Sequence, residues 1–563
     1  MYSKVNIRSQ TCKSSLKGTL AGRKKRKPHV LMVSAECRDI KTAGGLGDVV
    51  RELSKAVHRR GVRVSIVMPY YGVVTKVAVS LGKFKVPFGN RSWVVEWFQC
   101  SLDGVTVYLL RKHEFFGRQY KTVYIHSQQY PFEDDARRFA FFSSAVLAFI
   151  QQYAPLRSVN TLHCHDWHTG VLLTLLKYDP RYKELSECVR TLFTIHNVEY
   201  QGIRPFSSRI RRRWFSFSNW FPSLYVLLRT SGAIPSLRNP QPPLRWFNPM
   251  RAAIQLADHV NTVSPTYAIE LTRTEKPKLK FSGGRGLERD IARRKQQRHF
   301  HGILNGLDYT IHTPATLRPA FDITMLEWEK IRLQHKHVLI QQLPREITSF
   351  QNAGRLPRWN ANQLSTQLSA YDASEWFARP LVVMVTRATD QKVNMLLEKH
   401  HGKPLVEHIL HRNISLLILA TGEREHALND IVNCHPNAFF ICAFERTLAQ
   451  RIYAGGDLFL MPSDFEPCGI SQLMSMRYGC LPLVHGVGGL RDTVHHNKTG
   501  FVFTGKTRTQ TRQALLETLD AALHSFAHNR RRWRRMQWQA MRVRFNWTAS
   551  VERYISLYFT PND

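Results

Sequence analysis

The segment Pro-Ser-Asp-Phe-Glu-Pro-Cys-Gly-Ile at residues 462–470 contains two carboxylates and a thiol in one short turn. The apolar run at 458–461 predicts a buried strand before it, and the pattern of 471–479 predicts a helix after it. A turn from a strand into a helix N-terminus is a common place for an anionic ligand in an α/β sheet. We therefore predict a ligand-binding turn with Glu466 as its fixed carboxylate, although Pro and Gly also mark many ordinary turns.

Two cations follow another predicted strand, at residues 381–385. Arg387 and Lys392 can hold a diphosphate together through charge-assisted hydrogen bonds, each worth roughly 1.5 to 3 kcal/mol. Taken singly, each would be an ordinary surface charge. The Gly-Gly pair at 488–489 follows a further predicted strand, and its backbone amides complete a predicted nucleotide pocket.

Polar residues also end the predicted strands of the first half. The run Gly-Gly-Leu-Gly-Asp at 44–48 opens a predicted helix. Its backbone amides suit a phosphate or a sugar, and a plain helix cap is the alternative. The run His-Cys-His-Asp-Trp-His at 163–168 ends one strand, and His196 with Asn197 ends the next. Three histidines are also typical of a metal site, but no HExxH-type pattern accompanies them, and we expect no metal.

The elements that must position these residues alternate along the chain. A strand, a helix and a strand follow one another at the start, and the same order recurs in both halves. The predicted strands lie at 29–35, 63–69, 161–163, 190–196, 381–385, 415–420, 438–442 and 457–461. This order predicts an α/β fold with two doubly wound, Rossmann-like domains, at 29–268 and 269–540. Residues 344–379 are polar without a clear period, which predicts an insertion or loop.

The composition bounds the class of protein. The 563 residues contain 80 Lys and Arg against 42 Asp and Glu, a net charge of +38. Such a charge attracts polyanions, so nucleic acid is one possible partner. The alternative is that the proteome or cell interior of origin favours basic proteins in general. No apolar run reaches the roughly 18 residues of a membrane helix, so we expect no membrane span. The nine cysteines are scattered without a CxxC pair, which favours a reducing compartment without a zinc site.

Basic residues gather in three places. Residues 1–28 contain no acid and predict a disordered tail, with a transit peptide or a nucleic-acid-binding arm as alternatives. The clusters 209–213 and 530–535 are interleaved with tryptophans, and arginine with aromatic residues can stack on bases. In the second cluster, the arginine stems can equally cover apolar surface of a helix.

Taken in order, these segments resemble those of the bacterial and plant glycogen and starch synthases. The resemblance runs from about residue 29 to 558. The matching motifs are KTAGGLGDV at 41–49, HDWHTG at 165–170, FTIHNVEYQG at 193–202, ADHVNTVSPTYA at 257–268, GILNGLD at 302–308, RATDQK at 387–392, YAGGDLFLMPSDFEPCGISQL at 453–473, RYG at 477–479, GGLRDTV at 488–494 and TGFVF at 499–503.

The resemblance implies a GT-B fold, in which two Rossmann-like domains face an interdomain cleft and the C-terminal helix, 541–563, completes the first domain. It implies transfer of glucose from ADP-glucose, or UDP-glucose, to the nonreducing end of an α-1,4-glucan, with retention of configuration and without a cofactor. The cytoplasm is the expected location, with a plastid as the alternative. Nucleic acid stays a less favoured partner.

The resemblance also implies roles for individual residues. Glu466 would hold the donor glucose or stabilise positive charge at its anomeric carbon, and His196 would line the sugar pocket. The expected catalytic residues are Glu466, His196, Arg387 and Lys392. The expected substrate-binding residues are Lys41, Gly44, Gly45, Asp48, Asp166, Asn197, Cys468, Gly469, Gly488 and Gly489. Cys468 would line the pocket without acting as a nucleophile.

The glycine loop departs from the family pattern. The family places one residue between its lysine and Gly-Gly-Leu, whereas Thr42 and Ala43 both separate Lys41 from Gly44 here. Either Lys41 or Thr42 therefore takes the position of the family's lysine. This departure motivates an alternative to an active synthase, namely a catalytically weakened relative that binds glucan or nucleotide sugar. Polyanion binding through the basic segments is compatible with both.

Overall fold

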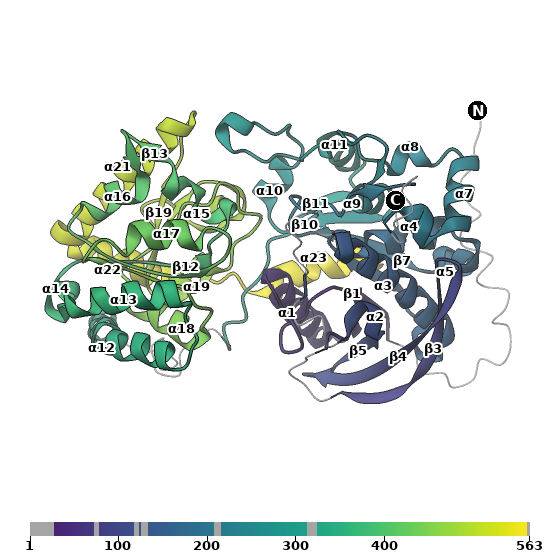
Figure 1. The fold of residues 1–563 in the computed structure, drawn as a ribbon, viewed down its shortest axis with the longest axis horizontal. Helices are drawn as coiled ribbons and strands as arrows, with labels where there is room; N and C mark the ends of the chain where they lie inside the picture. The colour runs from purple at the N-terminus through teal and green to yellow at the C-terminus, as the bar shows by residue number, and fades with distance from the viewer. Residues whose placement is uncertain are drawn as a thin grey trace. The chain divides into compact units, whose positions relative to one another are not determined.

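The structure is a computed structural model that describes residues 27–72, 78–117, 123–124, 133–207, 215–311 and 324–559. The basic N-terminal tail and the cluster 209–213 with Trp214 lie outside the described residues. Internal contacts divide the chain into two compact units, each an α/β body (Figure 1). The first contains the chain up to Asn261, Arg289–His301 and Thr548–Asp563, and the second contains Thr262–Glu288 and Gly302–Trp547.

The first unit is built on a nine-stranded sheet in the order β11-β10-β7-β6-β1-β2-β5-β4-β3. Strands β6, β1 and β2 run parallel at its centre, with β7 and β5 parallel on either side. These strands are β1 His29–Val33, β2 Arg63–Pro69, β5 Val105–Arg111, β6 Thr161–His165, β7 Arg190–Ile195, β10 His259–Thr262 and β11 Phe300–Gly302. The predicted parallel order is confirmed for this part of the sheet.

Two long strands extend this sheet in the antiparallel sense. Strands β3 Val79–Phe88 and β4 Arg91–Leu102 pair with each other, and β4 also pairs with β5. The alternation of strands and helices along the sequence does not predict this extension, because these strands have no helix between them.

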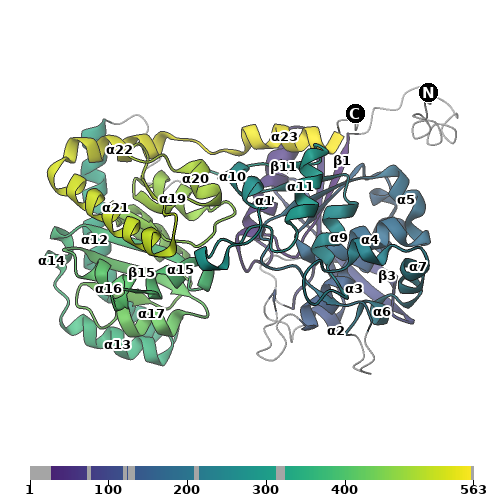
Figure 2. The ribbon, with the colours of Figure 1, turned by 90° about the horizontal axis from the view of Figure 1, so that it is seen from above.

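Helices cover the first sheet. Helices α3, α4 and α9 lie on one side of it, and α23 lies on the other (Figure 2). Helix α23 reaches the central strand β6, since Thr161 and His163 both hydrogen-bond to Tyr558. The main helices of this unit are α1 Gly45–Arg59, α3 Glu133–Gln152, α4 Gly170–Tyr178, α9 Pro249–Leu256, α11 Glu288–Gln296 and α23 Trp547–Phe559.

The second unit contains a six-stranded sheet in the order β16-β15-β12-β17-β18-β19, and every pair of neighbours is parallel. The strands are β12 Leu381–Arg387, β15 Ser415–Thr421, β16 Ala438–Ile441, β17 Leu458–Met461, β18 Leu481–His485 and β19 Phe501–Phe503. The chain moves outward from β12 to β16 and then returns to β17 on the other side. This reversal places the switch point between β12 and β17, and the carboxyl ends of such strands are where open α/β sheets bind ligands.

The helices that follow these strands begin close to the strand ends. They are α15 Asp390–Leu397, α17 Glu425–Val432, α18 Arg446–Gly455, α19 Ser471–Arg477, α20 Gly488–Thr493, α21 Arg508–His528 and α22 Arg530–Arg542. Within the residues that the structure describes, no helix is both long and apolar enough to cross a membrane.

The segment 344–379 is helical, which corrects the expectation of a loop. Its residues belong to α12 Met325–Asn352, α13 Arg358–Ser369 and α14 Ala373–Ala378. The apolar residues of these helices are sparse, so the pattern is weak, yet Ile347, Leu364 and Trp376 are buried in the second unit's core. Tertiary packing therefore stabilises helices that local periodicity does not reveal.

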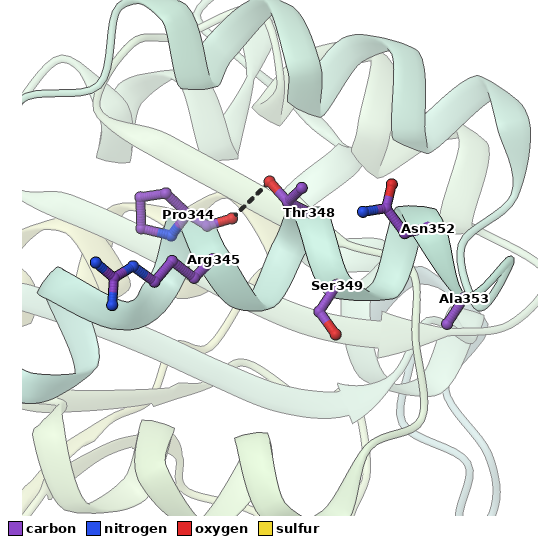
Figure 3. A pocket seen from close by; sticks show the side chains of 6 residues that line it. All are labelled: Pro344, Arg345, Thr348, Ser349, Asn352 and Ala353. Atoms are coloured by element: carbon purple, nitrogen blue, oxygen red, sulfur yellow. Dashed lines mark hydrogen bonds between the residues drawn. The ribbon is translucent and has the colours of Figure 1, made fainter.

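Pro344 lies inside α12 without ending it. Proline lacks the N–H that would bond to the carbonyl of Ile340, and the Tyr371 hydroxyl donates to that carbonyl instead (2.8 Å). A surface pocket opens beside this proline (Figure 3), where Thr348 Oγ1 donates to the Pro344 carbonyl (3.0 Å). All of its lining residues come from α12 or its C-terminal cap and none from a strand end, namely Pro344, Arg345, Thr348, Ser349, Asn352 and Ala353.

The basic cluster at 530–535 opens α22. Its Trp533 is only 3% exposed and packs against Phe526 and Phe501 in the core. The Arg530 guanidinium lies over the Phe526 ring, 3.8 Å from its centroid. Trp533 is therefore not available to stack on a base, and this arginine covers apolar surface.

Candidate active site

The turn at 462–470 leads from β17 into α19, as predicted, and its Glu466 is 5% exposed. Lys392, in the first turn of α15, makes an ion pair with Glu466 Oε2, and Ser463 Oγ donates to the same oxygen (3.2 Å). The backbone of Asp464 donates to the Gln391 carbonyl (2.8 Å). The structure thus brings Lys392 and Glu466 together where the adjacent strands β12 and β17 end.

Asp464 and Arg387, two further charged residues near this turn, differ in their surroundings. Asp464 pairs with Arg508 (2.5 Å), and burial raises the pKa of the Asp464 carboxyl to about 6. Arg387, the last residue of β12, is exposed, and no ion pair joins it to the described residues. Because Lys392 is already paired, Arg387 is the cation at this strand end whose charge is uncompensated within the described chain.

The glycine pair 488–489 lies directly against the turn. Gly488 has a positive φ of 44°, and a Cβ there would lie 1.9 Å from the Glu466 carbonyl oxygen. The Gly489 amide donates to that carbonyl (2.9 Å), and the Gly488 amide donates to Glu270 Oε1 (2.9 Å). Both amides expected to meet an incoming phosphate are therefore engaged within the protein, and the glycines serve close packing.

Cys468 and Gly469 complete the turn. The Cys468 side chain is buried, and burial raises the pKa of its thiol to about 12, so it stays protonated and is no nucleophile. Gly469 has a φ of 76°, and a Cβ there would lie 2.3 Å from Gln472 Oε1. Ser264, which caps α10 (Pro265–Glu270), donates to the Pro467 carbonyl (2.6 Å) and anchors the turn from outside.

In the first unit, the glycine loop closes around a carboxylate that the sequence analysis missed. Glu36, just after β1, is 1% exposed. Its Oε2 accepts hydrogen bonds from the Ala43 amide (2.5 Å), the Gly44 amide (2.9 Å) and Thr42 Oγ1 (3.0 Å), while its Oε1 accepts one from Tyr124. The Gly44 amide, which the sequence predicts to face a ligand, thus donates to Glu36 within the protein.

The other residues of the loop differ in whether their side chains are engaged within the protein. Thr42 directs its side chain at Glu36, whereas Lys41 makes a β-bridge with Cys37 and its side chain is half-buried. Asp48, expected to contact a sugar, pairs with Arg38 (2.8 Å), which also binds Glu52. Gly45 begins α1 and is exposed.

Asp166 shapes the backbone at the end of β7. It has a φ of 56°, and its Oδ1 accepts hydrogen bonds from the amides of His196 (2.7 Å) and Asn197 (3.4 Å). Burial raises the pKa of the Asp166 carboxyl to about 7, against the opposing effect of these two amides. The structure thus joins Asp166, His196 and Asn197, which the sequence placed on different strands.

The histidines at the ends of β6 and β7 bind to one another and to the protein. His165 Nδ1 lies 3.0 Å from His196 Nε2, and both ring nitrogens of His163 have hydrogen-bond partners. Burial lowers the pKa of all three imidazoles, so they are neutral. Over the described ranges, no group of three His, Cys, Asp or Glu side chains is arranged to hold a metal ion.

One exposed aromatic residue also lies at a strand end. Phe444 follows β16 and is 92% exposed. It lies beyond the carboxyl end of its strand, at the same edge of the sheet as Arg387. The signal for it is an aromatic residue two positions after the predicted strand at 438–442, which the sequence analysis did not weigh.

Comparisons with known proteins agree with this architecture. A family profile described as "Starch synthase catalytic domain" matches residues 29–293, and one described as "Glycosyl transferases group 1" matches residues 379–521. The chain is 32% identical to a glycogen synthase of Lactobacillus acidophilus over 94% of this chain and 98% of that protein. It is also 32% identical to a glycogen synthase of Streptococcus agalactiae, over 94% and 99%.

Solved structures give the same result. The catalytic domain of starch synthase IV from Arabidopsis thaliana, bound to ADP and acarbose, matches with a TM-score of 0.74 at 26% identity, covering 95% of this chain and 99% of that one. The sucrose-phosphate synthase of Thermosynechococcus elongatus matches with a TM-score of 0.51 at 15% identity, covering 95% and 98%, a likeness of fold alone. The chain has the GT-B fold and belongs to the glycogen and starch synthase family, as an enzyme of glucosyl transfer in glycogen or starch synthesis.

Proposed function

We propose that this enzyme transfers glucose from ADP-glucose to the nonreducing end of an α-1,4-glucan, with retention of configuration. The observation that carries this proposal is the Lys392–Glu466 pair at the switch point of the second sheet, beside the exposed Arg387. ADP bound to the Arabidopsis relative supports an adenine nucleotide as donor, with UDP-glucose as the alternative.

In the proposed reaction, the bond from the anomeric carbon to the diphosphate breaks, and a bond to the acceptor's 4-oxygen forms on the same face. The proton of that hydroxyl passes to the departing phosphate. Glu466, held by Lys392 and Ser463, stabilises the positive charge that develops at the anomeric carbon. Arg387 and Lys392 stabilise the negative charge of the leaving diphosphate.

Phe444 gives the second unit a surface for the nucleobase. An exposed aromatic ring at a ligand-binding sheet edge can stack on a base, which is worth about 1 to 3 kcal/mol. We assign the diphosphate to Arg387 and Lys392 and the base to Phe444. Gly488, Gly489, Cys468 and Gly469 shape this site by close packing. They carry no charge and make no ionic contact with the substrate.

We assign the sugar contacts of the first unit to His196 and Asn197, whose backbone Asp166 holds in place. Gly45 and the Lys41 side chain are the parts of the glycine loop left for substrate. Asp48 keeps a role only if its ion pair with Arg38 is shared with a sugar hydroxyl.

The test is glucosyl transfer by the purified full chain, with labelled ADP-glucose or UDP-glucose as donor and glycogen as acceptor. We expect transfer from ADP-glucose, and we expect Glu466→Ala and Lys392→Ala each to lower kcat by about 10²- to 10³-fold. Arg412→Ala is the matched control, since it breaks a surface ion pair with Asp520 in the same unit.

Three outcomes separate the alternatives. Absence of transfer from both donors overturns the proposed function. Calorimetric binding of ADP-glucose without turnover supports the catalytically weakened relative. Equal transfer by wild type and Glu466→Ala keeps the activity but removes Glu466 from its assigned role.

The proposed location is the cytoplasm, as the bacterial glycogen synthases to which the chain is similar suggest. Cell fractionation with an antibody against the chain checks it, and recovery in an organelle fraction would contradict it.

A further inference from the structure

A chain of buried contacts in the first unit leads from helix α23 to His196, with hydrogen bonds at both ends and ring packing between them. The Tyr558 hydroxyl lies 2.8 Å from His163 Nδ1, and His163 Nε2 lies 2.7 Å from Thr194 Oγ1. The side chains of Tyr558, His163 and Thr194 are all buried. Because no solvent reaches these groups, each must satisfy its hydrogen-bonding capacity within the chain.

The positions of the protons follow from these contacts. Thr194 Oγ1 donates its only hydrogen to Asn261 Oδ1 (2.6 Å), so it can only accept from His163 Nε2. Burial lowers the pKa of His163 well below its ordinary value, so the ring carries a single proton, on Nε2. Nδ1 of His163 is therefore an acceptor, and the Tyr558 hydroxyl is its donor.

His163 is linked to His165 by packing of their rings. The rings of His163 and His165 lie on the same face of β6 with their centroids 4.0 Å apart, tilted by 38°. No hydrogen bond joins these two rings in the described structure, so His163 acts on His165 by packing. The orientation that Tyr558 imposes on His163 thereby limits the orientation of His165.

His165 then determines which nitrogen of His196 carries the proton. His165 Nε2 is buried without a hydrogen-bond partner among the described residues, whereas Nδ1 lies 3.0 Å from His196 Nε2. An orphaned buried N–H is rarer than an under-used acceptor, so the proton of His165 is on Nδ1 and is donated to His196. His196 is also neutral, so its own proton is on Nδ1.

We propose that Tyr558 is a positioning residue for glucosyl transfer: it holds the His163 ring, which by packing fixes the His165 ring, and the N–H of His165 leaves His196 as a fixed N–H donor for an oxygen of the bound sugar. The proposal rests on the assigned role of His196 and deepens it by naming the tautomer and the residue that maintains it. The ligand group is an uncharged acceptor, such as a hydroxyl oxygen, because His196 offers a donor without a positive charge.

The test compares Tyr558→Phe with Tyr182→Phe. Both remove one buried tyrosine hydroxyl in the first unit, and among the described residues no hydrogen bond or ring contact joins Tyr182 to His163, His165 or His196. We expect similar losses of unfolding temperature, but a fall of kcat by about tenfold only in Tyr558→Phe, since a misplacement of 1 Å can cost ~10²-fold. Equal kcat values in the two variants would overturn the proposal.

A second readout does not depend on activity. In protein labelled with ¹⁵N-histidine, the signals lost in His196→Ala identify His196, and we expect them to show a proton on Nδ1 in the wild type and a mixed tautomer in Tyr558→Phe. A proton on Nε2 in the wild type would also overturn the proposal. If His196→Ala leaves transfer unchanged, the assigned role of His196 fails, while the tautomer measurement still tests the chain of contacts.

Discussion

Replacing Asp166 by asparagine should stabilise the protein at alkaline pH. Asparagine keeps an Oδ1 that accepts from the amides of His196 and Asn197, but it has no charge to bury. In the wild type, the carboxyl has a pKa of about 7 in the folded state, against a usual 3.8. Between these values the folded state holds a proton that the unfolded state has lost, so stability falls as the pH rises through this window and levels off above 7.

The size of the effect follows from the shift. A difference of roughly 3 pKa units at 1.36 kcal/mol each corresponds to about 4 kcal/mol above pH 7. For a unit of this size, that is roughly 8 to 16 °C in unfolding temperature. Other buried carboxyls, including Glu270 and Asp464, also have raised pKa values, so the informative quantity is the difference between variant and wild type at each pH.

The measurement is thermal unfolding of both proteins from pH 4 to pH 8.5. We expect the Asp166→Asn curve to lie progressively above the wild type as the pH rises, whereas Asp520→Asn, an exposed surface control, should follow the wild type. A variant no more stable than the wild type at pH 8.5 would refute the argument. Glucosyl transfer retained within about tenfold would indicate that Asp166 acts through the backbone, and a loss of ~10²-fold or more would indicate direct contact with the substrate.

Further expectations concern three other features of the site. Phe444→Ala should raise KM for ADP-glucose by about 5- to 100-fold with little change in kcat, as expected for one lost base stack; an unchanged KM would show that the ring does not meet the nucleobase. Glu36→Gln should lower kcat/KM by about tenfold, because the glycine loop loses charge-assisted hydrogen bonds worth roughly 1 kcal/mol more each than neutral ones; steady-state kinetics equal to wild type would count against a role for the loop. Gly488→Ala should abolish activity, since its Cβ would collide with the Glu466 carbonyl, while Gly354→Ala, at φ 63° in open space, should cost only about 1 to 2 kcal/mol of stability; an active Gly488→Ala enzyme would mean that the turn can move aside.

The parts of the site that could be predicted are those that follow from strand order. Arg387 and Glu466 each come after an apolar run, and parallel strands bring their carboxyl ends to one edge, so their neighbourhood follows from the alternation of elements. The sequence does not predict the pairing of Lys392 with Glu466. It depends on the return of the chain from β16 to β17, which a local pattern does not encode.

Other features depend on contacts that no spacing reveals. Glu36 looks like an ordinary acid after a strand, and only the fold of the glycine loop turns its carboxylate toward the loop amides. The glycine loop therefore has the sequence pattern of an anion-binding site, but the carboxylate of Glu36 is the anion that its amides bind in this structure. Similarly, His163 and Tyr558 are 395 positions apart, and nothing local to the HDWHTG motif indicates a partner at the other end of the sequence.

The position of α23 also has a consequence for biosynthesis. This helix completes the core of the first unit, yet the ribosome makes it only after the whole second unit has been translated. Domains usually fold as they emerge, with the N-terminal one first. Here the first unit must wait, with the strand β6 lacking its cover, until the last turns of helix leave the exit tunnel. A nascent chain that stalls earlier has no hydroxyl to meet His163, so on our proposal the fully active enzyme is assembled only once translation has passed Tyr558.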